Sequence, residues 1–281
     1  MDAITFLAAP SAMCLVLTGI HCYLGLHVLA RGVIFVDLSL AQVSALGATL
    51  ALALGIDHDS PLIYFFSLSA TFLAAFLFAI ARKQEKRFSQ EAIIGIVYAF
   101  GSASVVLLVD RMSHGAEHIK ELLVGQILWV SWFDVVKTAG IYSAVGLIHY
   151  IFRKQLLDAS FSLSKSESKW DFLFYGLFGI VITSSVHVAG VLQVFAFLIV
   201  PSIISTLFFQ TIRARLIFGW IFGVILSLVG MGLSFTFDMP SGAFIVVCFT
   251  TLPIIFVLLN PFLKKTTKTH DIQVPDVQNL S

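Results

Sequence analysis

The chain has 281 residues, of which 58% are hydrophobic and 12% are charged, and its formal net charge is +1. A soluble domain carries about 25% charged residues, so this composition excludes a water-soluble enzyme. The near-neutral charge, without any basic stripe, excludes a protein that binds nucleic acid. Apolar runs recur along the whole chain, which predicts a multi-pass membrane protein rather than one with a single anchor helix.

The expected fold class is all-α, a polytopic bundle of transmembrane helices. A bilayer core about 30 Å thick needs about 20 apolar residues per helix, and nine such runs occur, with counts of eight or ten left open. They cover residues 4–29, 34–55, 61–81, 91–109, 121–151, 171–187, 190–208, 215–236 and 242–260. Residues 1–263 are expected to form one transmembrane domain, and the polar tail at 264–281 is expected to be disordered.

The distribution of Lys and Arg predicts the orientation of these runs. If the basic loop at 82–87 is cytoplasmic and nine runs alternate, all but three of the 17 basic residues lie on that side. The exceptions are Arg111, Lys120 and Lys137. Because cytoplasmic loops retain Lys and Arg, we expect the N-terminus outside and the C-terminus in the cytoplasm.

A polar stripe marks the second run. Asp37, Ala41 and Ser44 recur there at helical spacing, and Ser39 and Gln42 lie on the adjoining face. Small residues let helices approach closely, whereas polar residues must find partners away from lipid. These positions are therefore either a packing seam or one wall of a substrate path, and both interpretations stay open.

Several histidines and acidic residues are candidates for holding a metal ion. On a helix, His114 and His118 would stand four residues apart beside Glu117, which suits Zn²⁺ or Mn²⁺. This string also matches the His-x-x-Glu-His of one zinc peptidase group. Metal capture, catalysis and a plain solvated loop are the open interpretations, although no third ligand accompanies the string. The full set of candidates is His21, His114, Glu117, His118, His187 and Asp238. His149, in contrast, is expected at the periphery.

The chain has no Gly-x-x-x-x-Gly-Lys-Ser/Thr phosphate-binding loop, so we expect it to bind no ATP by that route and no cofactor of its own. Energy for transport would then come from a partner that uses ATP or from a gradient. A segment at 207–215 could receive such a partner, because aromatic residues precede charged ones. It suits either a short helix lying across a partner's groove or an ordinary turn. Its candidate docking residues are Phe208, Phe209, Gln210, Thr211, Ile212 and Arg213.

Five strings taken together resemble the membrane subunit of the ABC-3 family, the zinc and manganese ABC importers. They lie at 29–36, 91–99, 123–128, 190–201 and 238–242, and the resemblance covers roughly residues 10–262. It implies a homodimeric permease in the cytoplasmic membrane of a bacterium. It also implies two cytoplasmic ATPases, docked at 207–215, and an extracytoplasmic binding protein that delivers metal.

One departure from the family is important. Family members carry Gly-Asp-Ala-Leu-Ser-His in the second run, where Asp and His are thought to hold the metal, but Leu38 and Gln42 stand at those two positions here. Asp37 lies one place earlier, roughly 100° around the helix. Either the ligands moved, to His21, His187 or the 114–118 string, or the substrate is not a bare ion.

The sequence therefore predicts the permease subunit of an ATP-driven importer, with a divalent transition metal as cargo. Three alternatives stay open: the same architecture with a metal chelate or cofactor as cargo, a gradient-driven carrier, and an intramembrane zinc hydrolase.

Overall fold

The computed structural model describes residues 3–57, 60–84, 89–112, 115–161 and 168–263, which form ten α-helices and one short 3-10 helix. The helices are α1 (Ala3–Arg31), α2 (Val36–Ala53), α3 (Pro61–Lys83), α4 (Gln90–Val109), α5 (Gly115–Val124), η1 (Ile127–Trp129), α6 (Trp132–Ile151), α7 (Arg153–Phe161), α8 (Ser168–Phe208), α9 (Ile212–Phe237) and α10 (Ser241–Leu263). The all-α prediction is confirmed for these residues. The tail at 264–281 lies outside them.

Long apolar helices dominate the bundle. Six of the described helices are long and apolar enough to cross a membrane, and α6 with α7, which meet at 82°, would make a seventh if they count as one span. Each of the nine predicted runs overlaps a described helix, but two of them share α8, and the run at 121–151 extends over the end of α5, η1 and α6. Nine crossings, and the orientation of the two ends, therefore stay predictions.

The helix α8 consists of two arms joined at Gly190. This glycine has φ 74° and ψ 164°, which is not helical, and only glycine adopts this region readily. The backbone of Gly125 approaches so closely that a Cβ on Gly190 would lie 2.4 Å from its nitrogen. The sequence placed the boundary between two runs at 187–190, and this break confirms that boundary.

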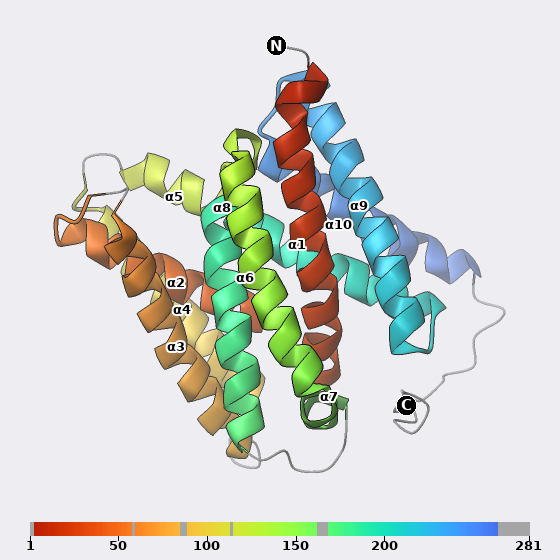
Figure 1. Cartoon of the computed structure of the whole chain (residues 1–281), viewed down its shortest axis with the longest axis horizontal. Helices are drawn as coiled ribbons and strands as arrows, with labels where there is room; N and C mark the ends of the chain where they lie inside the picture. The colour runs from red at the N-terminus through yellow and green to blue at the C-terminus, as the bar shows by residue number, and fades with distance from the viewer. Residues whose placement is uncertain (1–2, 58–59, 85–88, 113–114, 162–167, 264–281) are drawn as a thin grey trace.

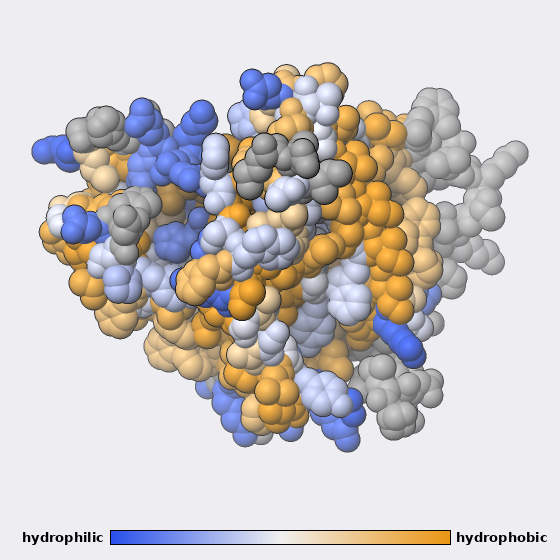
Figure 2. Space-filling view, turned by 45° about the horizontal axis from the view of Figure 1, so that its top comes forward, coloured by the Kyte–Doolittle hydropathy of each residue, from blue (hydrophilic) through white to orange (hydrophobic). Residues whose placement is uncertain are grey.

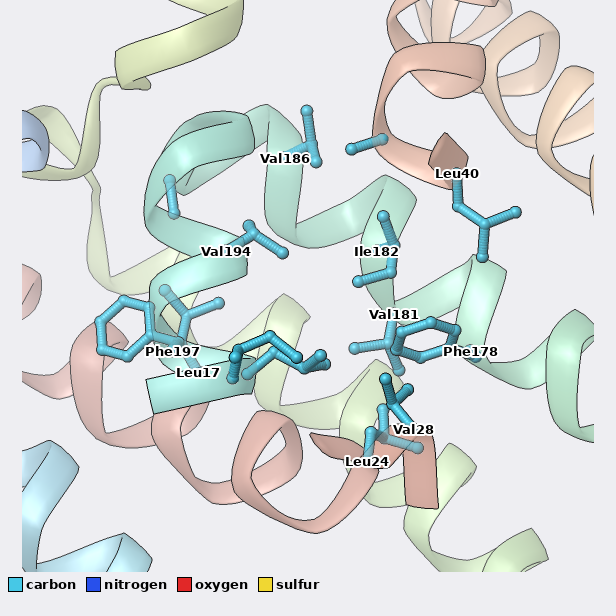
Figure 3. Close-up of a cluster of buried hydrophobic side chains, with 14 of the residues drawn as sticks. Leu17, Leu24, Val28, Leu40, Phe178, Val181, Ile182, Val186, Val194 and Phe197 are labelled. Atoms are coloured by element: carbon cyan, nitrogen blue, oxygen red, sulfur yellow. The ribbon is translucent and has the colours of Figure 1, made fainter. Parts of the chain in front are cut away.

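The two arms of α8 and the helix α1 hold the core together. Figure 1 shows α1, α6 and α8 side by side, with α2, α3 and α4 beyond α8 and with α9 and α10 beyond α1. Apolar side chains fill the space between the arms and α1 (Figure 3), among them Leu17, Leu24, Val28, Phe178, Val181, Val194 and Phe197. A Cβ on Gly25 of α1 would lie 2.1 Å from the carbonyl oxygen of Leu198, so this glycine permits the close packing.

Apolar residues cover the flanks of the bundle, and hydrophilic residues gather towards its ends (Figure 2). Among the six single-helix candidate spans, α4 is the least buried, with 22% of its apolar segment buried, and α2 is the most buried, with 72%. The helix that carries the predicted polar stripe is therefore an inner helix of the bundle.

Candidate substrate path and metal ligands

The helix α2 packs against α3, α4 and α8, and glycines allow two of these contacts. A Cβ on Gly47 would lie 2.5 Å from the carbonyl oxygen of Phe66 in α3. On the other side, Gly101 of α4 faces Gln42, whose Cβ would lie 3.3 Å from a Cβ on that glycine. Small residues thus let polar positions of α2 be enclosed by protein.

All four predicted path residues are buried on α2. Asp37 is 1% exposed, and neither of its carboxylate oxygens has a hydrogen-bond partner among the described residues. The hydroxyl of Ser39 also lacks a described partner. Gln42 and Ser44 follow along the helix and are buried as well. A carboxylate so enclosed cannot remain an unpaired ion, because desolvation is too costly, and it needs a proton or a cation.

A second carboxylate lies at the same end of α2. Glu91, in the first turn of α4, accepts a hydrogen bond from the backbone N–H of Phe35 at 3.2 Å. Its other oxygen has no hydrogen-bond partner among the described residues. Asp37 is in the first turn of α2, so two acidic residues meet at two neighbouring helix N-termini, where negative charge is favoured.

His21 forms hydrogen bonds within the helical bundle. Its Nδ1 lies 2.7 Å from the carbonyl oxygen of Leu17, and its Nε2 lies 3.1 Å from the Ser185 hydroxyl. A carbonyl only accepts, so Nδ1 carries the proton and donates. Both ring nitrogens of this candidate are therefore used within the fold, which favours a histidine bonded to a neighbouring helix over a metal ligand.

Within the described residues, the other metal candidates form no single cluster. His114 lies outside the described residues. On α5, Glu117 is exposed and His118 Nε2 lies 3.1 Å from the Thr49 hydroxyl of α2. Asp238 ends α9 with φ 53° and is exposed. Across the described part of the chain, no group of three or more His, Cys, Asp or Glu side chains could hold a metal ion.

A buried charged network was missed by the sequence reasoning, which placed Arg31 in a cytoplasmic loop. Arg31 is the last residue of α1, and its side chain is 0% exposed. It pairs with Asp171 of α8 at 2.8 Å, and Arg82 of α3 approaches the same carboxylate at 3.3 Å. The only signal in the sequence was a basic residue just after an apolar run, which reads equally well as a loop.

The expectation that His149 is peripheral is wrong, because the residue is 2% exposed. Its ring lies 6.3 Å from that of His27. The Ser160 hydroxyl of α7 joins His27 Nδ1 at 2.8 Å and accepts from Arg31 Nε at 2.9 Å. The bend between α6 and α7 folds α7 back against α1, and this contact encloses both histidines.

A polar cavity of 440 Å³ lies near the first turns of α3 and α6. Two further segments form its walls, the 126–130 segment that contains η1 and the end of the first arm of α8. It is lined by Tyr64, Gln126, Trp129, Val130, Asp134, Lys137, Thr138, Ile141, Ser184, His187 and Val188. The structure thus places one metal candidate, His187, in a cavity with residues that sequence reasoning did not connect to it.

Of the two interpretations left open for the segment at 207–215, the structure shows the turn and not a separate short helix. The helix α8 continues to Phe208 and α9 begins at Ile212, so only three residues link them. Arg215 donates from Nε to the Phe209 carbonyl at 2.8 Å, and the Thr211 hydroxyl accepts from the Ala214 N–H at 3.3 Å. These bonds close a tight turn, which leaves Gln210, Thr211 and Arg213 exposed.

A bundle of long apolar helices around an enclosed polar helix is typical of a multi-pass membrane protein, and comparison with known proteins adds its role. The sequence model of the ABC 3 transport family matches residues 4–260, and the chain belongs to this family. It is therefore a multi-pass transport subunit and not an enzyme, so the interpretation as a zinc hydrolase is wrong.

Individual relatives are distant but span most of the chain. The manganese transport system membrane protein MntC of Halalkalibacterium halodurans is 25% identical over 84% of this chain and 82% of its own. The structure of PsaBC from Streptococcus pneumoniae in complex with Fab has a TM-score of 0.73 and 22% identity, covering 90% of this chain and 92% of that one. An inward-facing putative metal-chelate type ABC transporter has a TM-score of 0.63 and 19% identity, covering 92% and 89%. The two solved structures share the fold.

Proposed function

We propose that this chain is the permease subunit of an ATP-driven importer that carries a divalent transition metal, of the zinc or manganese class, across the cytoplasmic membrane of a bacterium. Membership of the ABC 3 transport family supports the transport role. A relative that covers most of the chain is named for manganese transport, which supports the cargo. In this arrangement the chain crosses the membrane nine times, with its N-terminus outside and its C-terminus in the cytoplasm.

The proposal includes three kinds of partner. Two cytoplasmic ATPases hydrolyse ATP, because the chain lacks a phosphate-binding loop of its own. They dock at the turn between α8 and α9, where Gln210 and Arg213 are exposed between two long helices. A second copy of the chain completes the path, and an extracytoplasmic binding protein delivers the cargo.

The single observation that carries the metal path is the buried carboxylate of Asp37, whose two oxygens have no partner among the described residues. A cation passing along α2 supplies the positive charge that this carboxylate needs as a partner. Gln42 and Ser44 continue the polar surface of the same helix. ATP binding in the partner moves the α8–α9 turn, and the two copies then rock to open the path first outward and then inward.

The test is the metal content of cells with and without this chain, grown in chelated medium and scanned over Mn, Fe, Co, Ni, Cu and Zn. One metal should fall on deletion and return on re-expression. Asp37→Asn should lower its accumulation about tenfold, the order of one lost interaction with a charged group. Asp158→Asn, which changes an exposed carboxylate on α7, should accumulate metal like the wild type at equal membrane levels.

Two results would contradict parts of the proposal. An unaffected Asp37→Asn variant would remove α2 from the path. Uptake that continues when ATP is depleted but stops with an uncoupler would indicate a gradient-driven carrier. A chelate or cofactor as cargo is the second candidate, which Leu38 and Gln42 favour because they replace a carboxylate and an imidazole. No change in any metal on deletion would favour it over a bare ion.

A further inference from the structure

The surface of the bundle changes from apolar to charged at the corner where α6 ends and α7 begins. Leu147 and Ile151, at the end of α6, are 59% and 61% exposed. The chain then turns by 82° into α7, whose first two residues, Arg153 and Lys154, are exposed as well. With α6 as a membrane span, as predicted, α7 runs along the membrane surface. The corner then lies at the level where the hydrocarbon core gives way to lipid headgroups.

Aromatic rings and cations lie side by side at this corner. The guanidinium group of Arg153 lies 5.3 Å from the centre of the Tyr150 ring, and the ammonium group of Lys169, at the start of α8, lies 5.4 Å from the Trp170 ring. The ring of Phe152 lies 5.5 Å from that of Trp170, so the end of α6 and the start of α8 form one surface. We call it the corner patch, and its residues are Tyr150, Phe152, Arg153, Lys154, Lys169 and Trp170.

The corner patch has an excess of positive charge. Arg153, Lys154 and Lys169 are exposed cations. Among the described residues of α7 and of the first turn of α8, the exposed acid is Asp158 alone, because Asp171 is buried and paired within the bundle. Arg153 and Lys154 form no ion pair with any residue that the structure describes. Two neighbouring cations without a partner attract a negative group from outside the chain.

The position of these charges favours a lipid over a soluble anion. Tyr and Trp rings are enriched at the boundary between membrane and water, and basic residues there attract anionic headgroups. The exposed apolar flank of α6, with Leu147 and Ile151, leads directly into the corner patch. An occupant that matches both parts of this surface has a negative headgroup and hydrocarbon chains, and a phospholipid with a net negative charge has both.

We propose that the corner patch binds an anionic phospholipid. The phosphate of the lipid pairs with Arg153 and Lys154, and its acyl chains lie along the exposed flank of α6. Lys169 and Trp170 extend the same contact to α8, so that one lipid touches the end of α6 and the start of α8. This inference does not depend on the transport function proposed above, because it concerns a surface away from the helix α2.

Quenching of tryptophan fluorescence in lipid nanodiscs tests this inference on the full chain. Phosphatidylglycerol or phosphatidylcholine with brominated acyl chains, which quench nearby tryptophans, is mixed into unbrominated phosphatidylcholine. The signal from the corner patch is the part of the quenching that Trp170→Phe removes. One cation near an anionic surface changes affinity about fivefold, so the wild type should prefer phosphatidylglycerol at least about fivefold. The double variant Arg153→Gln with Lys154→Gln should show a preference close to one.

Two controls separate the charge from a general effect on the structure. Arg153→Lys keeps the charge and should retain the wild-type preference. Lys120→Gln removes an exposed cation of α5, at the opposite end of the bundle from α7 (Figure 1), and should retain it as well. The inference is overturned if the wild type shows no preference, or if the double variant prefers phosphatidylglycerol as strongly as the wild type. It is also overturned if neither lipid quenches Trp170, because protein and not lipid would then cover the corner.

Discussion

Asp171 is the residue on which the charged network at the end of α1 depends. Its carboxylate pairs with Arg31, whose side chain is 0% exposed, and with Arg82, whose side chain is 19% exposed. The substitution Asp171→Ala leaves both guanidinium groups without their shared partner, and Arg31 cannot reach water. Breaking a buried ion pair by removing one partner costs about 3–5 kcal/mol. Because the Arg31 side chain is completely enclosed, we expect Asp171→Ala to lower the free energy of unfolding by an amount within this range.

The expected result is a lower unfolding temperature. At roughly 2–4 °C per kcal/mol for chains of comparable size, the loss corresponds to a fall on the order of 10 °C. The cysteines provide the assay, since Cys14 and Cys22 are buried and react with a thiol-specific dye only when the bundle opens. Cys248 is partly exposed, so Cys248→Ser serves as the background for all variants.

Two further variants make this reasoning refutable. Asp158→Ala removes an exposed carboxylate on α7 and should change stability by less than about 1 kcal/mol. Adding Arg31→Met to Asp171→Ala should recover part of the loss, because the uncompensated buried charge is then gone. If Asp171→Ala and Asp158→Ala unfold at the same temperature, the charged network does not contribute the expected stability and the argument is wrong.

The same dye assay checks two predictions about glycines. Gly25→Ala should destabilise the bundle by about 1–3 kcal/mol, because its Cβ would lie 2.1 Å from the Leu198 carbonyl oxygen. Gly19→Ala on the same helix meets nothing within 4 Å and should be neutral, so equal effects would contradict the packing argument. Gly190→Ala should cost at least about 1–3 kcal/mol through backbone strain, since φ is 74° there. Gly140→Ala, with nothing within 4 Å, is its control, and a harmless Gly190→Ala would show that the arms of α8 join without that conformation.

Much of the candidate path could be found from the sequence, because it lies on one helix. The spacing of Asp37, Ser39, Gln42 and Ser44 was visible in the second run, and the structure buries all four on α2. The metal candidates fared differently. His21 proved to be hydrogen-bonded within the bundle. His187 lies in a cavity that is lined by three further segments besides its own arm of α8. Periodicity describes one helix at a time and contains no information about which neighbour faces it.

By itself, the sequence determined the class of protein, the order of its apolar segments and the boundary between two of them at 187–190, because hydropathy acts locally along the chain. The tertiary structure alone decided which polar groups meet. Arg31 and Asp171 are 140 residues apart and yet share one ion pair. Such pairs depend on how closely whole helices pack. This closeness is set by the surfaces of several helices at once, for example where Gly25 of α1 meets the backbone of α8.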